Sequence, residues 1–216
     1  MNKDFEKYAI SNGISSARIN QFENGYIEPT IIETNPHHMA SMSVFSKLFT
    51  ERILFLGCEI DSDVANIINS QLLYLAMTSD SPIKLYINSP GGSVYDGMSI
   101  YDTMKFIDCK VETTCIGTAA SMGAVLLAGG EKGKRFSLPH SQILLHSPSG
   151  GTGRVTAPDF RIAAKEMEKC ENMLYEVLAK DMGKDFDYVK KICDRDYWLT
   201  PEEAVKEGVI DKVITY

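Results

Sequence analysis

The chain has 216 residues, of which 44% are apolar and 24% charged, and a formal net charge of −7. This length suits one well-cored domain better than two. The acidic balance argues against nucleic acid or an anionic membrane as the main partner, because both select clustered Lys and Arg. We therefore expect the partner to be a protein, a peptide or a small molecule.

Five cysteines form an odd set without a Cys-x-x-Cys pair or a histidine at ligand spacing, so we expect reduced thiols and no metal site. The N-terminus has no apolar stretch of the secretory kind. The uncharged run 113–130 approaches the length of a membrane span, but its Thr, Ser and Gly content favours a buried core segment. These features predict a cytoplasmic protein.

The N-terminal part of the chain shows two different patterns. Residues 1–25 are polar and lack sustained apolar periodicity, so we expect a flexible or removable leader there and a single domain over 26–216. The first apolar rhythm consists of Met39, Met42, Phe45, Leu48 and Phe49, and it predicts a short amphipathic helix.

Three strand–helix units follow. Strands are predicted at 52–57, 83–88 and 110–116 from their β-branched and apolar content. The helix after the first strand is capped by Asp61 or Ser62 and has the inward apolar positions Val64, Ile67, Ile68, Leu72 and Leu75. The second helix follows Ser93, and its inward positions are Met98, Tyr101, Met104 and Phe106 or Ile107. The third helix covers 119–130. Repeated units of this kind predict an α/β fold with a parallel sheet, right-handed crossovers and sites at the strand ends.

The C-terminal part begins with two short predicted strands at 135–139 and 142–146. A Gly-rich loop leads from there to a long helix at about 157–182, which has the clearest helical periodicity of the chain. Its predicted inward positions are Phe160, Ala163, Ala164, Met167, Cys170, Leu174, Val177 and Leu178. Thr200 and Glu203 form a capping box, and Gly208 ends the helix that the box starts.

Ser121 lies among very small residues between the predicted strand 110–116 and the predicted helix. Ala119 and Gly123 on its two sides give a relaxed Gly-x-Ser-x-Gly elbow, in which a tight bend projects the hydroxyl and the next N–H, that of Met122, faces a developing oxyanion. Taken alone, the octapeptide 117–124 fits a close-packed serine in a small-residue helix better. Evidence for a nucleophile must come from other parts of the chain.

A serine nucleophile needs a base, usually histidine, and the chain has four histidines. His37 and His38 lie beside a proline in a polar lead-in, and His140 follows a turn. His146 closes an apolar strand and so lies at a strand end, as Ser121 does, although a turn histidine bonded to backbone fits it equally well.

An orienting acid and a second oxyanion donor also have candidates. Asp194 and Asp196 lie between two helices beside apolar residues, where a partly buried acid is plausible and exposed turn aspartates are the alternative. Gly92 of Pro-Gly-Gly has an N–H that could face the same oxyanion as Met122, although such a tripeptide is usually only a turn.

Several motifs occur in a specific order: LYINSPGGSV at 85–94, GMSIYDTM at 97–104, the 117–124 octapeptide, HSPSGG at 146–151, DRD at 194–196, and the segments around Glu203 and 208–211. Each is weak alone. Together, over about residues 26–215, they resemble the ClpP family, the proteolytic subunits of ATP-dependent Clp proteases.

The resemblance implies Ser121 as nucleophile, His146 as general base and Asp196 as orienting acid, with the N–H groups of Gly92 and Met122 as the oxyanion hole. It implies a ClpP/crotonase-like fold in which the long helix is a protruding handle that joins two stacked seven-membered rings into a chamber. Unfolded proteins would be fed in by an AAA+ ATPase such as ClpX or ClpA. The subunit itself would bind no metal, nucleotide or other cofactor.

The chain departs from the family pattern at four places. Ser147 follows His146 where Gln is usual, the run 153–160 differs at the entry to the handle, and 36–41 replaces the usual Arg-Gly-Glu-Arg. Lys84 stands two positions before Tyr86, where an aromatic residue usually receives the ATPase. These departures affect ring contacts and the axial entrance rather than catalysis.

Two other functions fit the same fold. A crotonase-type acyl-CoA hydratase or isomerase would use the two oxyanion N–H groups on a thioester, and a non-catalytic subunit would only support active relatives in a ring. Retention of Ser121, His146 and Asp196 in order argues against both and favours a serine endopeptidase.

Overall fold

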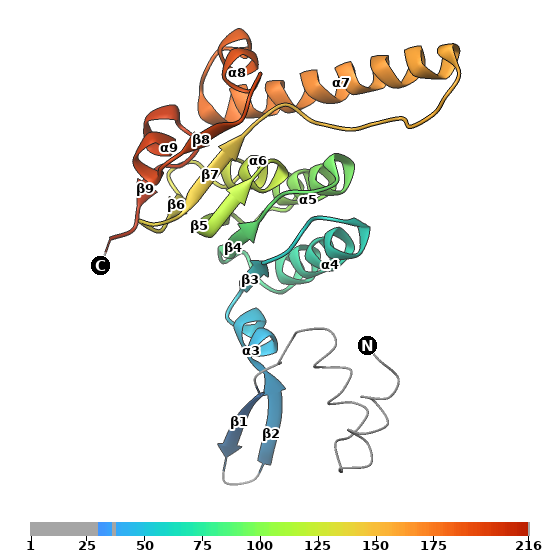
Figure 1. The fold of residues 1–216 in the computed structure, drawn as a ribbon. Coiled ribbons are helices and arrows are strands. Elements are labelled where there is room, and N and C mark those ends of the chain that lie inside the picture. The colour runs from blue at the N-terminus through green and yellow to red at the C-terminus, as the bar shows by residue number, and fades with distance from the viewer. Residues whose placement is uncertain (1–29, 36–37, 216) are drawn as a thin grey trace, which may run out of the picture. The chain divides into compact units, whose positions relative to one another are not determined.

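The computed structural model describes residues 30–35 and 38–215 (Figure 1). The chain divides after Glu51 into two compact units, each of which is described by itself. The leader predicted at 1–25 and the candidate His37 lie outside the described residues.

The described part of the first unit is a hairpin followed by a helix. Strand β1 (Thr30–Asn35) pairs antiparallel with β2 (His38–Ser43), and helix α3 (Val44–Thr50) follows directly. The Ser43 side chain caps α3 by accepting the Ser46 N–H at 3.0 Å. The helix predicted from Met39 onward is therefore wrong over Met39 and Met42, because that stretch takes its hydrogen-bond partners from β1.

The second unit is built on a mainly parallel sheet. Five of its strands follow the order β3-β4-β5-β6-β9, and each neighbouring pair is parallel. These strands are β3 (Ile53–Leu56), β4 (Ile83–Ser89), β5 (Val111–Ala120), β6 (Arg135–Ser137) and β9 (Lys212–Val213). Strand β7 (Gln142–Leu145) also pairs parallel with β5, and β8 (Tyr197–Leu199) pairs antiparallel with β7. The predicted parallel sheet of strand–helix units is confirmed.

Helices α4 (Ser62–Thr78), α5 (Val94–Phe106) and α6 (Met122–Ala128) lie side by side along the sheet (Figure 1). The Asp61 carboxylate caps α4, as predicted, by accepting the Val64 N–H at 2.9 Å. The predicted inward position Ile67 is wrong, since it is 57% exposed; of the alternatives Phe106 and Ile107, Phe106 is 79% exposed and Ile107 is half-buried. Ile67 and Phe106 lie on the solvent side of helices whose other faces already cover the sheet.

Strand β5 forks the sheet and thereby sets the position of Ser121. Its first half pairs with β6 through Thr113–Cys115 and its second half with β7 through Thr118–Ala120. Gly117, at φ +102°, lies between the halves, and a Cβ there would come within 2.7 Å of Asn88 Oδ1. Because the β7 ladder extends β5 to Ala120, the third helix begins at Met122 instead of the predicted residue 119.

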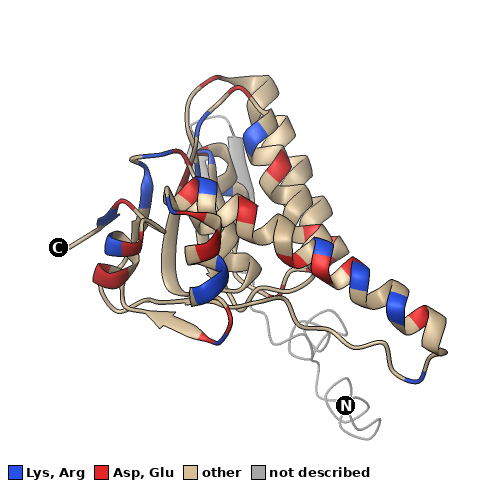
Figure 2. Ribbon diagram, turned by 90° about the horizontal axis from the view of Figure 1, so that it is seen from above, with Lys and Arg blue, Asp and Glu red and all other residues tan. Residues whose placement is uncertain are grey.

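Helix α7 (Ala157–Met182) has the predicted bounds, with Thr156 as its N-terminal cap and Gly183, at φ +67°, at its end. Only its second half packs on the unit, through Leu174, Tyr175, Leu178, Ala179 and Met182. Its first half projects beyond the sheet (Figure 1), and Figure 2 shows acidic and basic residues spread along the helix. The predicted inward positions Phe160 and Met167 are exposed.

The chain returns from α7 through α8 (Phe186–Ile192), β8 and α9 (Pro201–Glu207). The capping box predicted at Thr200 and Glu203 is present, and Gly208 ends α9 with φ +80°. This return path brings the segment 193–197 beside the end of β7.

Candidate active site

Ser121 occupies a strained turn between β5 and α6. Its φ of 54° and ψ of −123° are rare for a residue with a side chain. Its N–H donates to the Leu144 carbonyl at 2.9 Å, and its carbonyl accepts the first helical N–H groups. Although Ser121 is the N-terminal cap residue of α6, its side chain makes no capping hydrogen bond. The half-buried hydroxyl is therefore left for other chemistry.

The Pro-Gly-Gly loop after β4 packs directly against Ser121. A Cβ on Gly91, at φ +95°, would lie 2.6 Å from Ser121 Cβ and 2.7 Å from the Ala120 carbonyl oxygen. The loop is held by the Ser89 hydroxyl, which donates to the Cys58 carbonyl at 2.6 Å while its oxygen accepts the Gly91 N–H at 3.1 Å. Glycine is needed at residue 91 because the two backbones approach so closely.

Gly92 forms an isolated parallel bridge with Ile60. The Ile60 N–H donates to the Gly91 carbonyl and its carbonyl accepts the Ser93 N–H, both at 2.8 Å. A Cβ on Gly92 would lie 2.2 Å from the Ile60 oxygen, so a side chain would displace this loop. Met122 is the first residue of α6, and an N–H at that position has no partner within its own helix.

A small pocket brings Ser121 and His146 together. Its wall is mostly apolar and consists of Val94, Ser121, Met122, Val125, Leu145, His146, Pro148, Leu174 and Leu178. The four-residue strand β7 places His146 directly after Leu145, and the second half of α7 supplies the two leucines. His140, by contrast, is exposed in the turn before β7, and the side chain of His38 is not described.

The register of β8 against β7 places Asp196 near His146 in the backbone. The last pair of that antiparallel ladder is Leu145↔Tyr197, and His146 and Asp196 are the residues next to that pair on the two segments. The Ser147 N–H donates to the Cys193 carbonyl at 2.7 Å and joins the same two segments. Because the ladder register would place Ser147 opposite Arg195, this bond lies two residues out of register, and both Asp194 and Asp196 belong to the stretch between it and the ladder. Asp194 and Asp196 are both exposed, contrary to the expectation of a partly buried acid, because this segment lies beyond the end of the ladder.

Within residues 30–35 and 38–215, no side-chain hydrogen bond joins Ser121, His146 and Asp196. Two of the three side chains thus share a pocket, and the third belongs to the residue directly before Tyr197, which pairs with Leu145.

The match to the family model of the Clp protease covers residues 36–216. The chain belongs to the Clp protease family. This membership confirms the resemblance inferred from the ordered motifs, together with the α/β fold and the serine endopeptidase class of enzyme. It supports hydrolysis of peptide bonds over the acyl-CoA hydratase and the non-catalytic alternatives.

Curated relatives extend this finding over nearly the whole chain. The chain is 46% identical to an ATP-dependent Clp protease proteolytic subunit of Porphyromonas gingivalis, over 98% of this chain and 97% of that one. It is 45% identical to the subunit of Bacteroides thetaiotaomicron, with 98% of each chain covered. It is also 45% identical to proteolytic subunit 1 of Salinibacter ruber, over 86% of this chain and 80% of that one.

The pocket wall is the part of this Clp protease site that the sequence did not identify. Leu174 and Leu178 were predicted to face inward from α7, but nothing in the helical period indicated that they meet Ser121 and His146. Val94 and Pro148 come from two further segments. Only the packing of α7 on α6 and β7 assembles this wall.

The other ionisable groups of the described residues do not form a metal centre. No group of three or more His, Cys, Asp or Glu side chains suited to a metal ion occurs there. All five cysteines are free thiols, and burial raises the pKa of Cys115 to about 11 and that of Cys193 to about 12. No helix of the described part is long and apolar enough to cross a membrane.

Proposed function

We propose that Ser121 is the nucleophile of this peptidase and His146 its general base. The observation that carries the proposal is the strained Ser121 turn, whose hydroxyl makes no capping bond and lines the same pocket as His146. His146 would accept the Ser121 proton as Oγ attacks the scissile carbonyl carbon, and would then donate it to the leaving amine. Water, activated by the same histidine, would release the acyl group and restore Ser121.

Asp196 is proposed as the acid that orients His146. The position of Asp196 directly before Tyr197, whose ladder partner Leu145 precedes His146, supports this role. A carboxylate there would hold the imidazole in the tautomer that accepts the serine proton and would stabilise the imidazolium that forms.

The N–H groups of Gly92 and Met122 are proposed as the oxyanion hole. Support comes from the contact of the Gly91-Gly92 loop with Ser121 and from the position of Met122 at the first turn of α6. Donors fixed in the backbone need no reorganisation as charge develops on the substrate oxygen. The apolar pocket wall would receive an apolar side chain of the peptide next to the cleaved bond.

We further propose a single peptidase domain over residues 26–216, preceded by a leader at 1–25. By analogy with the family, two homomeric seven-membered rings would stack into a tetradecamer that encloses the sites. An AAA+ unfoldase of the ClpX or ClpA kind would deliver unfolded proteins in the cytoplasm. Hydrolysis would require no cofactor, nucleic acid or membrane.

The test is Ser121→Ala, which removes the attacking atom from a site already lined by small residues. We expect peptide cleavage and labelling by a serine-reactive fluorophosphonate to be lost, with folding and the number of subunits in the assembly unchanged. His146→Ala should lose cleavage to a similar extent, and the double variant should be no worse, because the two groups act as one unit. Undiminished cleavage by Ser121→Ala would refute the assignment.

A further inference from the structure

Arg135, the first residue of β6, has a buried guanidinium that is held in one orientation. The residue is 1% exposed and forms a bidentate ion pair with Asp211, in which Nε donates to Oδ2 at 2.9 Å and Nη2 donates to Oδ1 at 2.6 Å. Asp211 Oδ2 also accepts the N–H groups of Gly133 and Arg135, at 2.8 and 3.0 Å. Two bonds from a planar fork fix the plane of the guanidinium, so the direction of its third nitrogen is set.

This third nitrogen, Nη1, lies at the C-terminal ends of three helices. It donates to the carbonyl of Ala128, the last residue of α6, at 3.3 Å, and to those of Asp181, in the last turn of α7, and Gly208, at the end of α9, both at 2.9 Å. Carbonyls at the end of a helix have no partner within the helix, and the negative end of the helix dipole favours a cation. A single side chain therefore joins these three helix ends.

The helix ends also pack closely around this side chain. A Cβ on Gly130, two residues after α6, would lie 3.1 Å from Arg135 Cγ. A Cβ on Gly208 would lie 2.4 Å from the Met182 carbonyl oxygen at the end of α7. Glycine at these two positions allows the end of α6 to approach the arginine stem and the end of α9 to approach α7.

Two of the joined helix ends lie one turn beyond the apolar wall of the Ser121 pocket. Val125 of α6 lines this pocket and precedes Ala128 by three residues. Leu178 of α7 also lines it and precedes Asp181 by three residues. Residues three apart lie on the same face of a helix, about one turn from each other. The Nη1 contacts thus join α6 to α7 one turn away from the side chains that these helices contribute to the pocket.

We propose that Arg135, oriented by Asp211, is a positioning residue that sets the width of the apolar pocket by fixing the distance between α6 and α7. The inference rests on the proposed function, in which this pocket receives a side chain of the peptide, and it adds a residue that determines which side chain fits. Loss of the Nη1 contacts should therefore change the choice among peptides. A ratio of kcat/KM values for two peptides does not depend on the fraction of protein that is folded and active, so lower stability alone cannot change it.

The primary variant is Arg135→Lys, which keeps a cation beside Asp211. The single nitrogen of lysine cannot form the bidentate pair and bond to the ends of α6 and α7 at the same time. For the purified assembled protein, kcat/KM is measured with two blocked peptides that differ only in the residue before the cleaved bond, leucine or tryptophan. We expect the tryptophan-to-leucine ratio of kcat/KM to rise about tenfold over wild type, because a wider pocket admits the larger ring and a misfit of one methylene already changes such ratios by about tenfold or more.

The matched control is Thr113→Val. Thr113 is also buried, and its hydroxyl donates to the carbonyl of Leu127 at 2.7 Å, so this variant removes a bond to the same end of α6 and leaves the bonds of Arg135 in place. Thermal stability should fall in both variants. The tryptophan-to-leucine ratio should stay at the wild-type value in Thr113→Val.

A wild-type ratio in Arg135→Lys would overturn the inference, as would an equal change of the ratio in Thr113→Val. If Arg135→Lys did not assemble, the double variant Arg135→Met with Asp211→Asn would decide, because it removes both charges and leaves neither one buried alone. An unchanged ratio there would also overturn the inference.

The wild-type protein separates this inference from the function on which it rests. If wild type cleaved the two peptides equally well, the proposed role of the pocket would be refuted, and the inference with it. If wild type distinguished them and Arg135→Lys kept the same ratio, only the role of Arg135 would be refuted.

Discussion

Asp194 and Asp196 are two exposed carboxylates only two residues apart, and Asp196 is the one that directly precedes Tyr197, the partner of Leu145 in the last β7–β8 pair. The side chain of Asp194 is 75% exposed and lies 3.9 Å from the guanidinium of its neighbour Arg195. At the residue scale, Asp196 is the preferred candidate because it lies next to the end of the ladder and is the match in the family's motif, whereas burial does not distinguish the two.

We therefore predict that Asp196→Asn lowers kcat for a short peptide by on the order of 10⁴, because the imidazole loses the group that fixes its tautomer. Asp194→Asn is the matched control and should lose far less. Steady-state kinetics of both variants at equal native mass give the comparison. A loss confined to Asp194→Asn would reverse the assignment.

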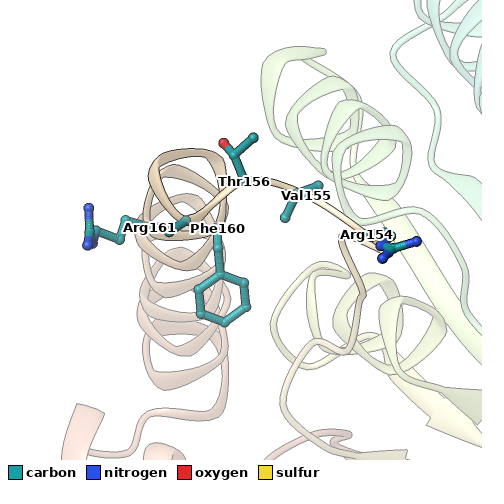
Figure 3. Close-up of a pocket in the computed structure, with 7 residues that line it drawn as sticks. Arg154, Val155, Thr156, Phe160 and Arg161 are labelled. Carbon is teal, nitrogen blue, oxygen red and sulfur yellow. The ribbon is translucent and has the colours of Figure 1, made fainter.

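At the scale of elements, the first half of α7 is a helix without a core of its own. Phe160 and Ile162 are 60% and 66% exposed, and Met167 is 38% exposed. Phe160 lies beside the loop that leads into the helix, where residues 153–157, Phe160 and Arg161 line a pocket (Figure 3). Isolated amphipathic segments of this kind gain stability by burying their apolar side chains against another surface.

We predict that Phe160→Asp shifts the native mass from the double ring proposed above to a single ring. Burial of one such aromatic side chain contributes roughly 1.5–3 kcal/mol, and each subunit of a ring would lose it. Analytical ultracentrifugation measures the shift. Lys180→Gln, an exposed change on the packed half of the same helix, should keep the wild-type mass, and an unchanged mass for Phe160→Asp would exclude this face from ring contacts.

At the scale of the whole molecule, the leader proposed at 1–25 is expected to be removed by the peptidase itself. Its polar composition offers no core-forming pattern, so cleavage should cost little stability. Intact-mass measurement should find wild-type protein without the leader and Ser121→Ala with it. Identical trimming of both proteins, or retention of Met1 in both, would rule out self-processing.

The surface proposed for the ATPase lies around β3 and β4. Tyr86 stacks on the partly exposed ring of Phe55 at 5.3 Å and 17°, and Lys84 is exposed two positions earlier, on the same face of β4. An ammonium group gives a docking Ile, Leu or Phe less apolar area to cover, although its methylene stem provides some.

Lys84→Tyr is therefore predicted to tighten the docking of a generic ClpX, and the gain should be amplified because several clefts act together. ATPase-dependent degradation, titrated with the peptidase ring, measures the affinity, and cleavage of short peptides without ATPase serves as the control that should not change. An unchanged affinity would place Lys84 outside the docking surface.

The sequence by itself determined the features whose causes are local. The strained elbow at Ser121 follows from its small neighbours, and the bounds of α7 and α9 follow from Thr156, Gly183 and the Thr200–Glu203 capping box. Caps, glycine turns and apolar periodicity act over a few residues, so they can be identified without knowing the rest of the fold.

Only the tertiary structure decided the features that depend on distant pairing. Pairing with β1 made Met39 and Met42 part of a strand, and pairing with β7 carried β5 on to Ala120. The three-residue strand β8 is too short to leave a pattern, yet its pairing with β7 brings the segment that carries Asp196 beside the end of β7. Hydrogen bonds between segments far apart in the chain override local propensity, and this is why a tight turn at Ser121 could be predicted from its small neighbours whereas the surroundings of His146 could not.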